Sequence, residues 1–150
     1  PVIAAGGIGT GRGMLAAMVL GADGVQVGSR FAASLESSAH TNFKETILSV
    51  KEGGTQLTLK ELAPVRLIKN KFFEDLQELY GKCPSKEDLI AFLGRARAKR
   101  GMFEGDLTDG ELEIGQIAGL INEIKSAEDI IIEMLAEFNT AQLEVTEFLF

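Results

Sequence analysis

The sequence has very little of the chemistry that builds disulfides or metal centres. Its 150 residues include one cysteine, Cys83, and one histidine, His40, and no tryptophan. A single cysteine excludes an intramolecular disulfide, and this pair cannot form a Cys/His metal cluster of the usual spacing. Apolar runs of the roughly 20 residues that span a membrane are missing, as is the pattern of a signal peptide. We therefore expect a cytoplasmic protein with no bound metal and no membrane partner.

Positive charge is also scarce. Fifteen lysines and arginines face 22 aspartates and glutamates, which gives a net charge of −7. This charge repels phosphate backbones and anionic membrane surfaces, so nucleic acid is not an expected partner. The 45% of hydrophobic residues is sufficient for one sizeable core. Pro1 lies inside an apolar, strand-like run, which favours a numbering that begins within a longer protein.

Glycine, by contrast, is concentrated near the start of the chain. The stretch AAGGIGTGRG, residues 4–13, has five glycines in ten positions. Apolar segments at residues 2–5 and 24–28 favour two short strands, and a helix is predicted over about residues 11–20 between them. Neither strand alternates cleanly, which is typical of parallel strands covered on both faces. The sequence therefore predicts a βαβ unit.

From about residue 34 the apolar pattern has mostly a helical period, apart from a weak strand pattern at residues 55–60. A hydroxyl residue followed three positions later by an acid predicts helix starts at Ser85, Thr108 and Ser126. Apolar stripes over residues 114–124 and 127–138 predict a helical hairpin that packs on a core or forms a subunit interface. The apolar residues outside these stripes are Ile132, Phe148, Leu149 and Phe150.

Both predicted strands end in turns suited to anions. Gly6 and Gly7 follow the first strand, and Gly28, Ser29 and Arg30 follow the second. Glycine lets a ligand approach the main chain, and the first N–H groups of a following helix lack internal partners. Two neighbouring parallel strands would thus present two anion-binding loops at one edge, as in the phosphate sites of TIM barrels.

Two other interpretations of these loops stay open. The loops could be tight βα connections without a ligand. Gly11, Gly13 and Ala16 also satisfy the G-x-G-x-x-G/A pattern of a Rossmann-like dinucleotide fold, in which Arg30 would select NADP. That pattern comes several residues after the strand rather than directly after it. A P-loop is excluded because no G-K-[ST] is present.

Four stretches carry a family resemblance. PVIAAGGIGTGRGMLAAMVLGADGVQVGSRF, SSAHTNFKETIL, PVRLIKNKF and GDLTDGELEIGQIAGLI span about 120 of the 150 residues. They resemble the FMN-dependent nitronate monooxygenase family, formerly called 2-nitropropane dioxygenases, which includes flavin-containing enoyl-acyl-carrier-protein reductases. A weaker likeness is to IMP dehydrogenase, whose strands also end in GGI and GS.

The resemblance implies that the two turns bind the phosphate of FMN, chiefly through backbone N–H groups. The residues implied to bind the cofactor are Gly6, Gly7, Gln26, Val27, Gly28 and Ser29. Arg30 either contacts the phosphate or anchors the loop through an internal ion pair. No catalytic residue is assigned here, because the family's catalytic histidine lies in a Gly-Gly-His turn on an earlier strand.

The implied fold is α/β: residues 1–33 form the closing βαβ of a (β/α)8 TIM barrel, and residues 34–150 form a mostly helical extension. The implied activity is oxidation of alkyl nitronates with O₂ to a carbonyl compound and nitrite. The alternatives are an NAD(P)H-dependent enoyl reductase and a noncatalytic helical interaction fragment. The expected partners are a small-molecule substrate and a second copy of the chain. The isolated chain is expected neither to turn over nitronates nor to hold FMN tightly.

Several other polar residues have structural rather than catalytic interpretations. His40 is expected on a helix surface and Cys83 in an inert turn. The basic run that contains Arg95, Arg97, Lys99 and Arg100 suits a helix C-terminus. Arg66 and Lys69 are the better candidates for contact with an anionic substrate. Gly115 and Gln116 match the family and are expected in a helix that approaches a neighbour closely.

Overall fold

The computed structural model describes residues 1–147, so the apolar Phe148, Leu149 and Phe150 lie outside the described residues. The chain forms two compact units. Unit 1 joins residues 1–37 with the C-terminal segment from residue 123, and unit 2 is residues 38–122. The boundary expected between residues 33 and 34 stays a prediction.

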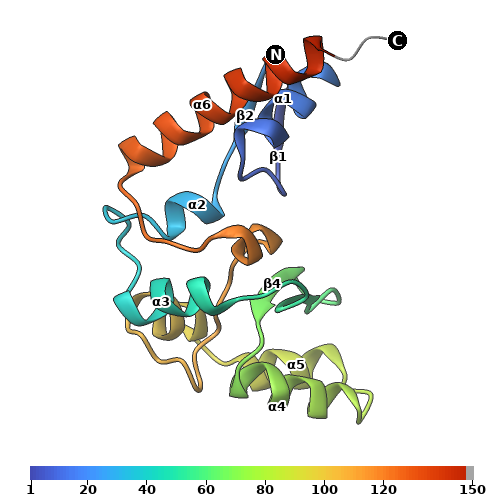
Figure 1. Cartoon of the computed structure of the whole chain (residues 1–150). Helices are drawn as coiled ribbons and strands as arrows, with labels where there is room; N and C mark the ends of the chain where they lie inside the picture. Colours follow the sequence, from blue (N-terminus) through green and yellow to red (C-terminus); the bar gives the residue numbers. More distant parts are fainter. Residues whose placement is uncertain (148–150) are drawn as a thin grey trace. The chain divides into compact units, whose positions relative to one another are not determined.

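Unit 1 contains the predicted βαβ unit. Strands β1 (Ile3–Ala5) and β2 (Gly24–Gln26) pair in parallel, with Ile3 opposite Gly24 and Ala5 opposite Gln26, and helix α1 (Gly11–Val19) connects them. The short helix α2 (Ser29–Ala32) follows β2. Helix α6 (Ala127–Thr146) returns to lie along α1 (Figure 1). The predicted strand, helix and strand are therefore confirmed.

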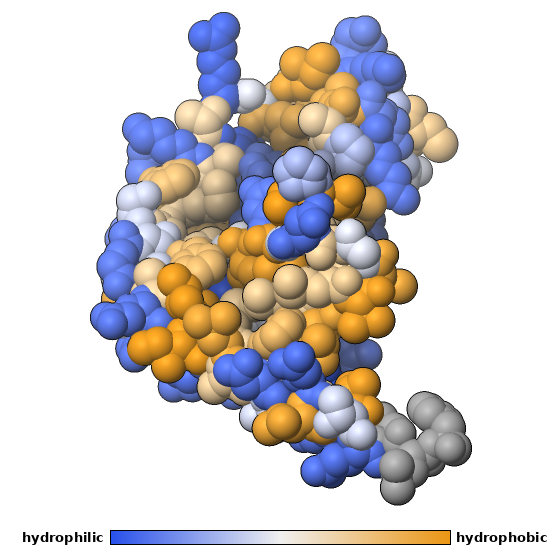
Figure 2. Space-filling view, turned by 90° about the horizontal axis from the view of Figure 1, so that it is seen from above, coloured by the Kyte–Doolittle hydropathy of each residue, from blue (hydrophilic) through white to orange (hydrophobic). Residues whose placement is uncertain are grey.

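The N-cap of α6 is the predicted Ser126, whose hydroxyl accepts a hydrogen bond from the N–H of Asp129 at 3.0 Å. The predicted stripe of α6 is only half buried: Ile130 and Met134 are buried, whereas Ile131 and Leu135 are about half exposed. Exposed apolar residues are visible as orange patches among blue hydrophilic ones in the face shown in Figure 2. Part of the apolar stripe of α6 is therefore exposed.

Unit 2 begins with helix α3 (Thr41–Ser49) and an antiparallel hairpin of β3 (Thr55–Thr58) and β4 (Val65–Ile68). Helices α4 (Lys71–Tyr80) and α5 (Lys86–Leu93) follow. Ser85 forms the predicted capping box with Asp88 at the start of α5. The strand expected at residues 55–60 is confirmed as β3, whereas β4 was not predicted.

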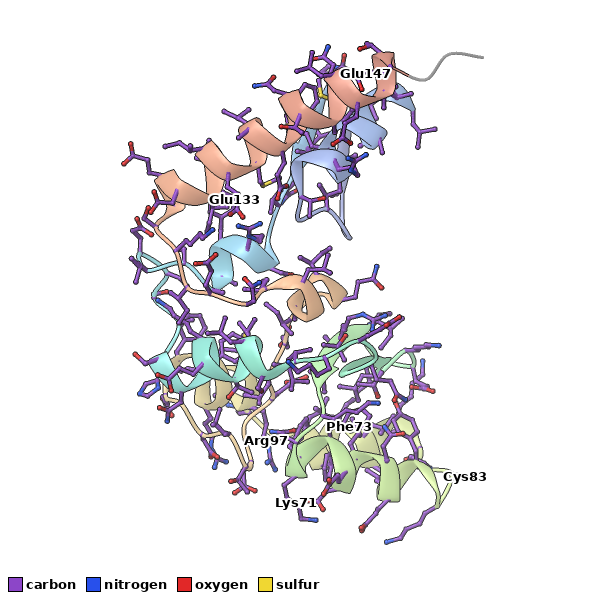
Figure 3. The ribbon with its side chains drawn as sticks, in the orientation of Figure 1. Lys71, Phe73, Cys83, Arg97, Glu133 and Glu147 are labelled. Carbon is purple, nitrogen blue, oxygen red and sulfur yellow. The ribbon has the colours of Figure 1, made fainter. Side chains whose placement is uncertain are left out.

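The core of unit 2 lies between the hairpin and these two helices. It is formed by Leu59, Leu67, Phe72, Phe73, Leu76 and Leu89. Arg97 covers this core from one side, with its guanidinium 5.2 Å from the Phe72 ring centroid and 5.8 Å from that of Phe92. Figure 3 labels Arg97 and Phe73, the latter on α4. Aromatic packing of this kind supplies a large buried apolar area.

The predicted helix over residues 114–124 is wrong. Only a short 3₁₀ helix, η2 (Gln116–Leu120), forms there, after a π-helical turn, η1 (Lys99–Phe103), earlier in the chain. The segment before η2 adds to the sheet instead, because Ile68 N–H donates to Leu112 O at 2.9 Å and Ile114 N–H to Arg66 O at 3.0 Å. Of the predicted stripe, Ile114 is buried in this pairing and Ile117 and Ala118 are buried in η2, so no helical hairpin forms.

The helix start predicted at Thr108 is also wrong. The side chain of Asp106 accepts hydrogen bonds from the N–H groups of Thr108 at 3.1 Å and Asp109 at 2.9 Å, which closes a turn. An aspartate that bonds the backbone two and three residues on competes with helix formation. Within residues 1–147, no helix is both long enough and apolar enough to cross a membrane.

Candidate phosphate-binding site

The two glycine turns leave the same edge of the β1–β2 sheet. Because β1 and β2 are parallel and in register, Ala5 and Gln26 are paired at the end of the ladder. Gly6 follows Ala5, and Val27 and Gly28 follow Gln26. Parallel strands therefore deliver both turns to one place, as the sequence predicted.

Open space lies beside both turns. Gly6 has φ +86° and Gly7 has φ +72°, a conformation that residues with a Cβ rarely adopt. A Cβ built on Gly6 or on Gly28 would meet no atom within 4 Å. A ligand can thus approach the main chain at each turn, which is what a phosphate bound by backbone N–H groups requires.

The remaining predicted residues surround the second turn. Gln26 is the exposed last residue of β2, Val27 is half-buried in the link, and Ser29 is the first residue of α2. No side chain caps the start of α2, where Gly28 is the N-cap residue. All six predicted residues therefore lie in unit 1, around two turns that fit a phosphate group.

The start of α1 differs from this pattern and corrects one expectation. Its N–H groups are already bonded: Gly13 N–H donates to Thr10 Oγ1 at 3.0 Å, and Gly11 N–H donates to Glu137 Oε2 at 2.6 Å. A carboxylate of α6 thus occupies the positive end of α1. The phosphate-binding role expected of this helix start is taken by the protein itself.

Gly11 is explained by packing. A Cβ at this position would lie 2.0 Å from Met134 O and 2.3 Å from Phe138 N. The backbones of α1 and α6 cross so closely that only glycine fits. This accounts for one of the five glycines without a ligand, and it removes the basis for the Gly11, Gly13 and Ala16 dinucleotide pattern.

Arg30 anchors the first turn from inside unit 1. Its Nη1 donates to Gly9 O at 2.9 Å, and its Nη2 donates to Glu133 Oε2 at 2.5 Å. The Arg30 side chain is only 13% exposed. Of the two roles considered for Arg30, the structure shows the internal ion pair.

Glu133 connects this anchor to α6, from which it extends in Figure 3. Lys125 Nζ also donates to Glu133 Oε2, at 3.1 Å. Burial alone would raise the pKa of Glu133, but the hydrogen bonds from Arg30 and Lys125 lower it below its usual value. Glu133 is therefore held in its charged form beside the turn.

Sequence reasoning missed Glu133 and Glu137. They are four residues apart on α6, so they lie on the same face of that helix. Together with Thr10, Arg12, Ala136 and Thr140 they line a groove of about 600 Å³. This groove runs between α1 and α6, and none of the six candidate phosphate-binding residues lines it.

The other polar candidates lie in unit 2. His40 is the N-cap residue of α3, where its Nδ1 accepts from Asn42 N–H at 3.1 Å. Cys83 is exposed in the turn after α4 (Figure 3). Lys69 is exposed and Arg66 half-buried on β4 or just after it, and Gln116 opens η2. Across residues 1–147, no cluster of His, Cys, Asp and Glu side chains is arranged to hold a metal ion.

Comparison with known proteins gives consistent results. The family profile described as nitronate monooxygenase matches residues 1–137. A probable nitronate monooxygenase of Staphylococcus aureus strain Newman is 39% identical over 105 residues, which cover 67% of this chain and 30% of that protein. The chain therefore spans less than a third of the length of this relative.

Two solved structures are also similar. FabK from Thermotoga maritima is 39% identical, with a TM-score of 0.90 over 99% of this chain and 47% of that one. A nitroalkane oxidase from Streptomyces ansochromogenes is 28% identical, with a TM-score of 0.76 over 97% of this chain and 41% of that one. Both resemble this chain along almost all of its length.

Proposed function

The chain belongs to the nitronate monooxygenase family, and from that membership we propose that its two glycine turns bind the phosphate of FMN in a flavin-dependent oxidoreductase. The binding residues are Gly6, Gly7, Gln26, Val27, Gly28 and Ser29. The observation that carries the proposal is the parallel β1–β2 pair, which brings two turns with open main chain to one sheet edge.

In the proposed site the cofactor and the protein have different roles. FMN supplies electron transfer when bound, and the protein supplies binding and orientation. Backbone N–H groups at the two turns would bind the phosphate oxygens. No positively charged side chain is needed for this contact. Arg30 acts indirectly, because its bonds to Gly9 O and Glu133 hold the first turn in shape.

We further propose that residues 1–33 are the closing βαβ of a TIM barrel and that the later helices extend from it. Supporting this, Ile3 of β1 and the preceding Val2 are 55% and 63% exposed, as expected where a parallel sheet is covered by further parts of a barrel. A cytoplasmic location and self-association remain parts of the same proposal.

The reaction that we propose is oxidation of a nitronate with O₂ to a carbonyl compound and nitrite. The likeness to a nitroalkane oxidase and to a probable nitronate monooxygenase supports this choice. Enoyl reduction with NAD(P)H is the second candidate, and the likeness to FabK keeps it open. Both reactions would use the same phosphate-binding turns.

Nuclear magnetic resonance of the ¹⁵N-labelled 150-residue chain tests the binding site directly. Titration with FMN should shift the amide signals of Gly6, Gly7, Gly28 and Ser29. Riboflavin, which lacks the phosphate, should leave these signals unchanged at the same concentration. Equal shifts with both compounds, or none with FMN, would contradict the proposal.

Substitution of Gly28 makes the test sharper. Gly28→Ala should preserve the fold, because its Cβ would meet no atom within 4 Å, but the methyl group fills space needed by the phosphate. We expect the affinity for FMN, measured from these amide shifts, to fall about tenfold. Gly119→Ala in unit 2, where the nearest atom would lie at 3.5 Å, is the matched control and should bind FMN normally.

A further inference from the structure

A cavity of unit 2 is lined by residues other than those of the glycine turns. Its volume is about 660 Å³, and it opens between the turn after α3, the β3–β4 hairpin and η2. The lining residues that carry the argument are Lys51, Gly53, Thr55, Arg66, Gln116 and Gly119. The family resemblance in sequence includes Arg66 and Gln116, but the phosphate-binding proposal uses neither.

Arg66 is fixed in this cavity by one residue. Its Nη1 donates to Thr55 O at 3.1 Å and to Thr55 Oγ1 at 3.2 Å. A guanidinium has five N–H donors, of which two belong to Nη1. The Nε and Nη2 edge, the geometry that binds two oxygens of one oxyanion side by side, is left for another partner.

This half-buried arginine also lacks a carboxylate partner. Among residues 1–147, no acidic oxygen lies within 4.0 Å of the Arg66 guanidinium, whereas Arg12, Arg30 and Arg100 all form ion pairs. Arg97 has no ion pair either, but its Nε, Nη1 and Nη2 donate to backbone carbonyls. The charge of Arg66 and its Nε and Nη2 edge are therefore available to a ligand.

The rest of the lining suits an anionic molecule. Lys51 adds a second positive charge, and Glu52 is the one acidic residue that lines the cavity. Gly53, at φ +72°, would carry a Cβ with nothing within 4 Å, so the main chain there is open to a ligand. Gln116 offers an amide for a further hydrogen bond.

We propose that this cavity binds a small molecule through a carboxylate or phosphate group, which the Nε and Nη2 edge of Arg66 receives and Lys51 helps to neutralise. Thr55 is a positioning residue that holds the guanidinium in place. This site is independent of the FMN-binding turns, because all of its residues lie in unit 2.

Amide shifts of the labelled 150-residue chain at low ionic strength test the proposal with inorganic phosphate and with succinate as separate probes. At least one probe should shift the amides of Gly53, Gly54 and Gly119. Shifts confined to Gly6, Gly7 and Gly28 would overturn this proposal while supporting the FMN one. The stronger probe identifies the class of oxyanion.

Three charge variants complete the test. Arg66→Lys keeps the positive charge but loses the paired N–H donors of the guanidinium. The affinity for whichever probe binds more tightly should therefore fall about tenfold. Lys51→Gln should cost about threefold. Lys82→Gln removes the same charge from an exposed residue of unit 2 that does not line the cavity, and it should bind like the original chain.

Two results would overturn the proposal: unchanged affinity in Arg66→Lys, or an equal loss in Lys51→Gln and Lys82→Gln. If Arg66→Lys fails to fold, as judged by its amide spectrum, the comparison of the two lysine variants decides by itself.

Discussion

The two units differ in where their large apolar side chains lie. In unit 2, Phe72 and Leu76 are 1% and 0% exposed, within a core shared by the hairpin and two helices. In unit 1, Val19 and Leu20 are 76% and 89% exposed at the end of α1. Unit 2 thus has a hydrophobic core of its own, whereas many of the large apolar side chains of unit 1 are exposed in residues 1–147.

Unit 1 combines the packing of α1 on α6 with contacts between charged and polar groups. Glu137 bonds the first N–H of α1, and Glu133 bonds Arg30, which in turn bonds Gly9 O. Such contacts are directional and contribute less free energy than burial of a core. Unit 2 is therefore ordered mainly by apolar burial, whereas in unit 1 charge-assisted hydrogen bonds around the glycine turns add to the packing of α1 on α6.

The largest effect that follows is on the core of unit 2. Leu76→Ala removes a fully buried side chain and should lower the free energy of unfolding by about 2–5 kcal/mol. Leu20→Ala, the same change at an 89% exposed position of unit 1, should change it by less than about 0.5 kcal/mol. Urea unfolding measures both losses. Equal losses would contradict the difference in apolar burial between the two units.

A second effect concerns pH and is confined to unit 2. Glu111 is 8% exposed, and burial, together with the charge of Glu113, raises its pKa to about 7. Because its folded pKa lies above the unfolded value, stability is fully present below about pH 4.5 and is lost as pH rises through 7. Unit 2 should therefore weaken between pH 5 and pH 8.

Glu111→Gln removes this penalty. At pH 8 the variant should be more stable than the original chain by up to about 3 kcal/mol, and at pH 4.5 the difference should vanish. Glu45→Gln, at an exposed position of α3, is the control and should change stability little at either pH. Urea unfolding at the two pH values measures both variants. A stability difference of Glu111→Gln that does not change with pH would show that the raised pKa of Glu111 is not the cause.

Local sequence patterns predicted the elements whose order is set by near neighbours. The capping pairs at Ser85 and Ser126 fixed two helix starts, since a hydroxyl and a nearby acid act within one turn. The βαβ unit followed from two apolar segments and the glycines after them. The same reasoning placed the candidate turns at one sheet edge, because parallel pairing requires it.

Long-range pairing could not be predicted in this way. Residues 114–124 have the apolar spacing of a helix, but at Ile114, where that stripe begins, the backbone bonds Arg66 O of β4 instead. Glu133 and Glu137 are more than a hundred residues from the turn that they support. Their acidic side chains look like an ordinary solvated helix face until α6 is known to return to α1.

A third prediction tests the closeness of α1 and α6 in unit 1. Gly11→Ala would place a Cβ 2.0 Å from Met134 O, so the two helices must separate. We expect a loss of about 1–3 kcal/mol, with faster hydrogen exchange in α1 than in α4. Gly13→Ala, whose Cβ would lie 3.3 Å from Thr10 Oγ1, is the matched control and should cost far less. Similar losses in both variants would mean that packing does not explain Gly11.

The smallest effect distinguishes half-buried from exposed charge on α6. Glu133→Gln leaves Arg30, which is 13% exposed, without its carboxylate and should cost about 1 kcal/mol at pH 7. Glu144 is also on α6 and forms an exposed ion pair with Arg12 of α1. Glu144→Gln breaks this pair and should cost less than about 0.5 kcal/mol. Since the folded pKa of Glu133 is lowered, the difference between the two variants should be present above about pH 4.5 and should disappear as pH falls below it. Amide signals of Gly7 and Gly9 should move in Glu133→Gln alone, because only Glu133 holds the arginine that bonds the first turn. If both variants behave alike, unit 1 does not depend on this charge, and the contrast with the apolar core of unit 2 must have another cause.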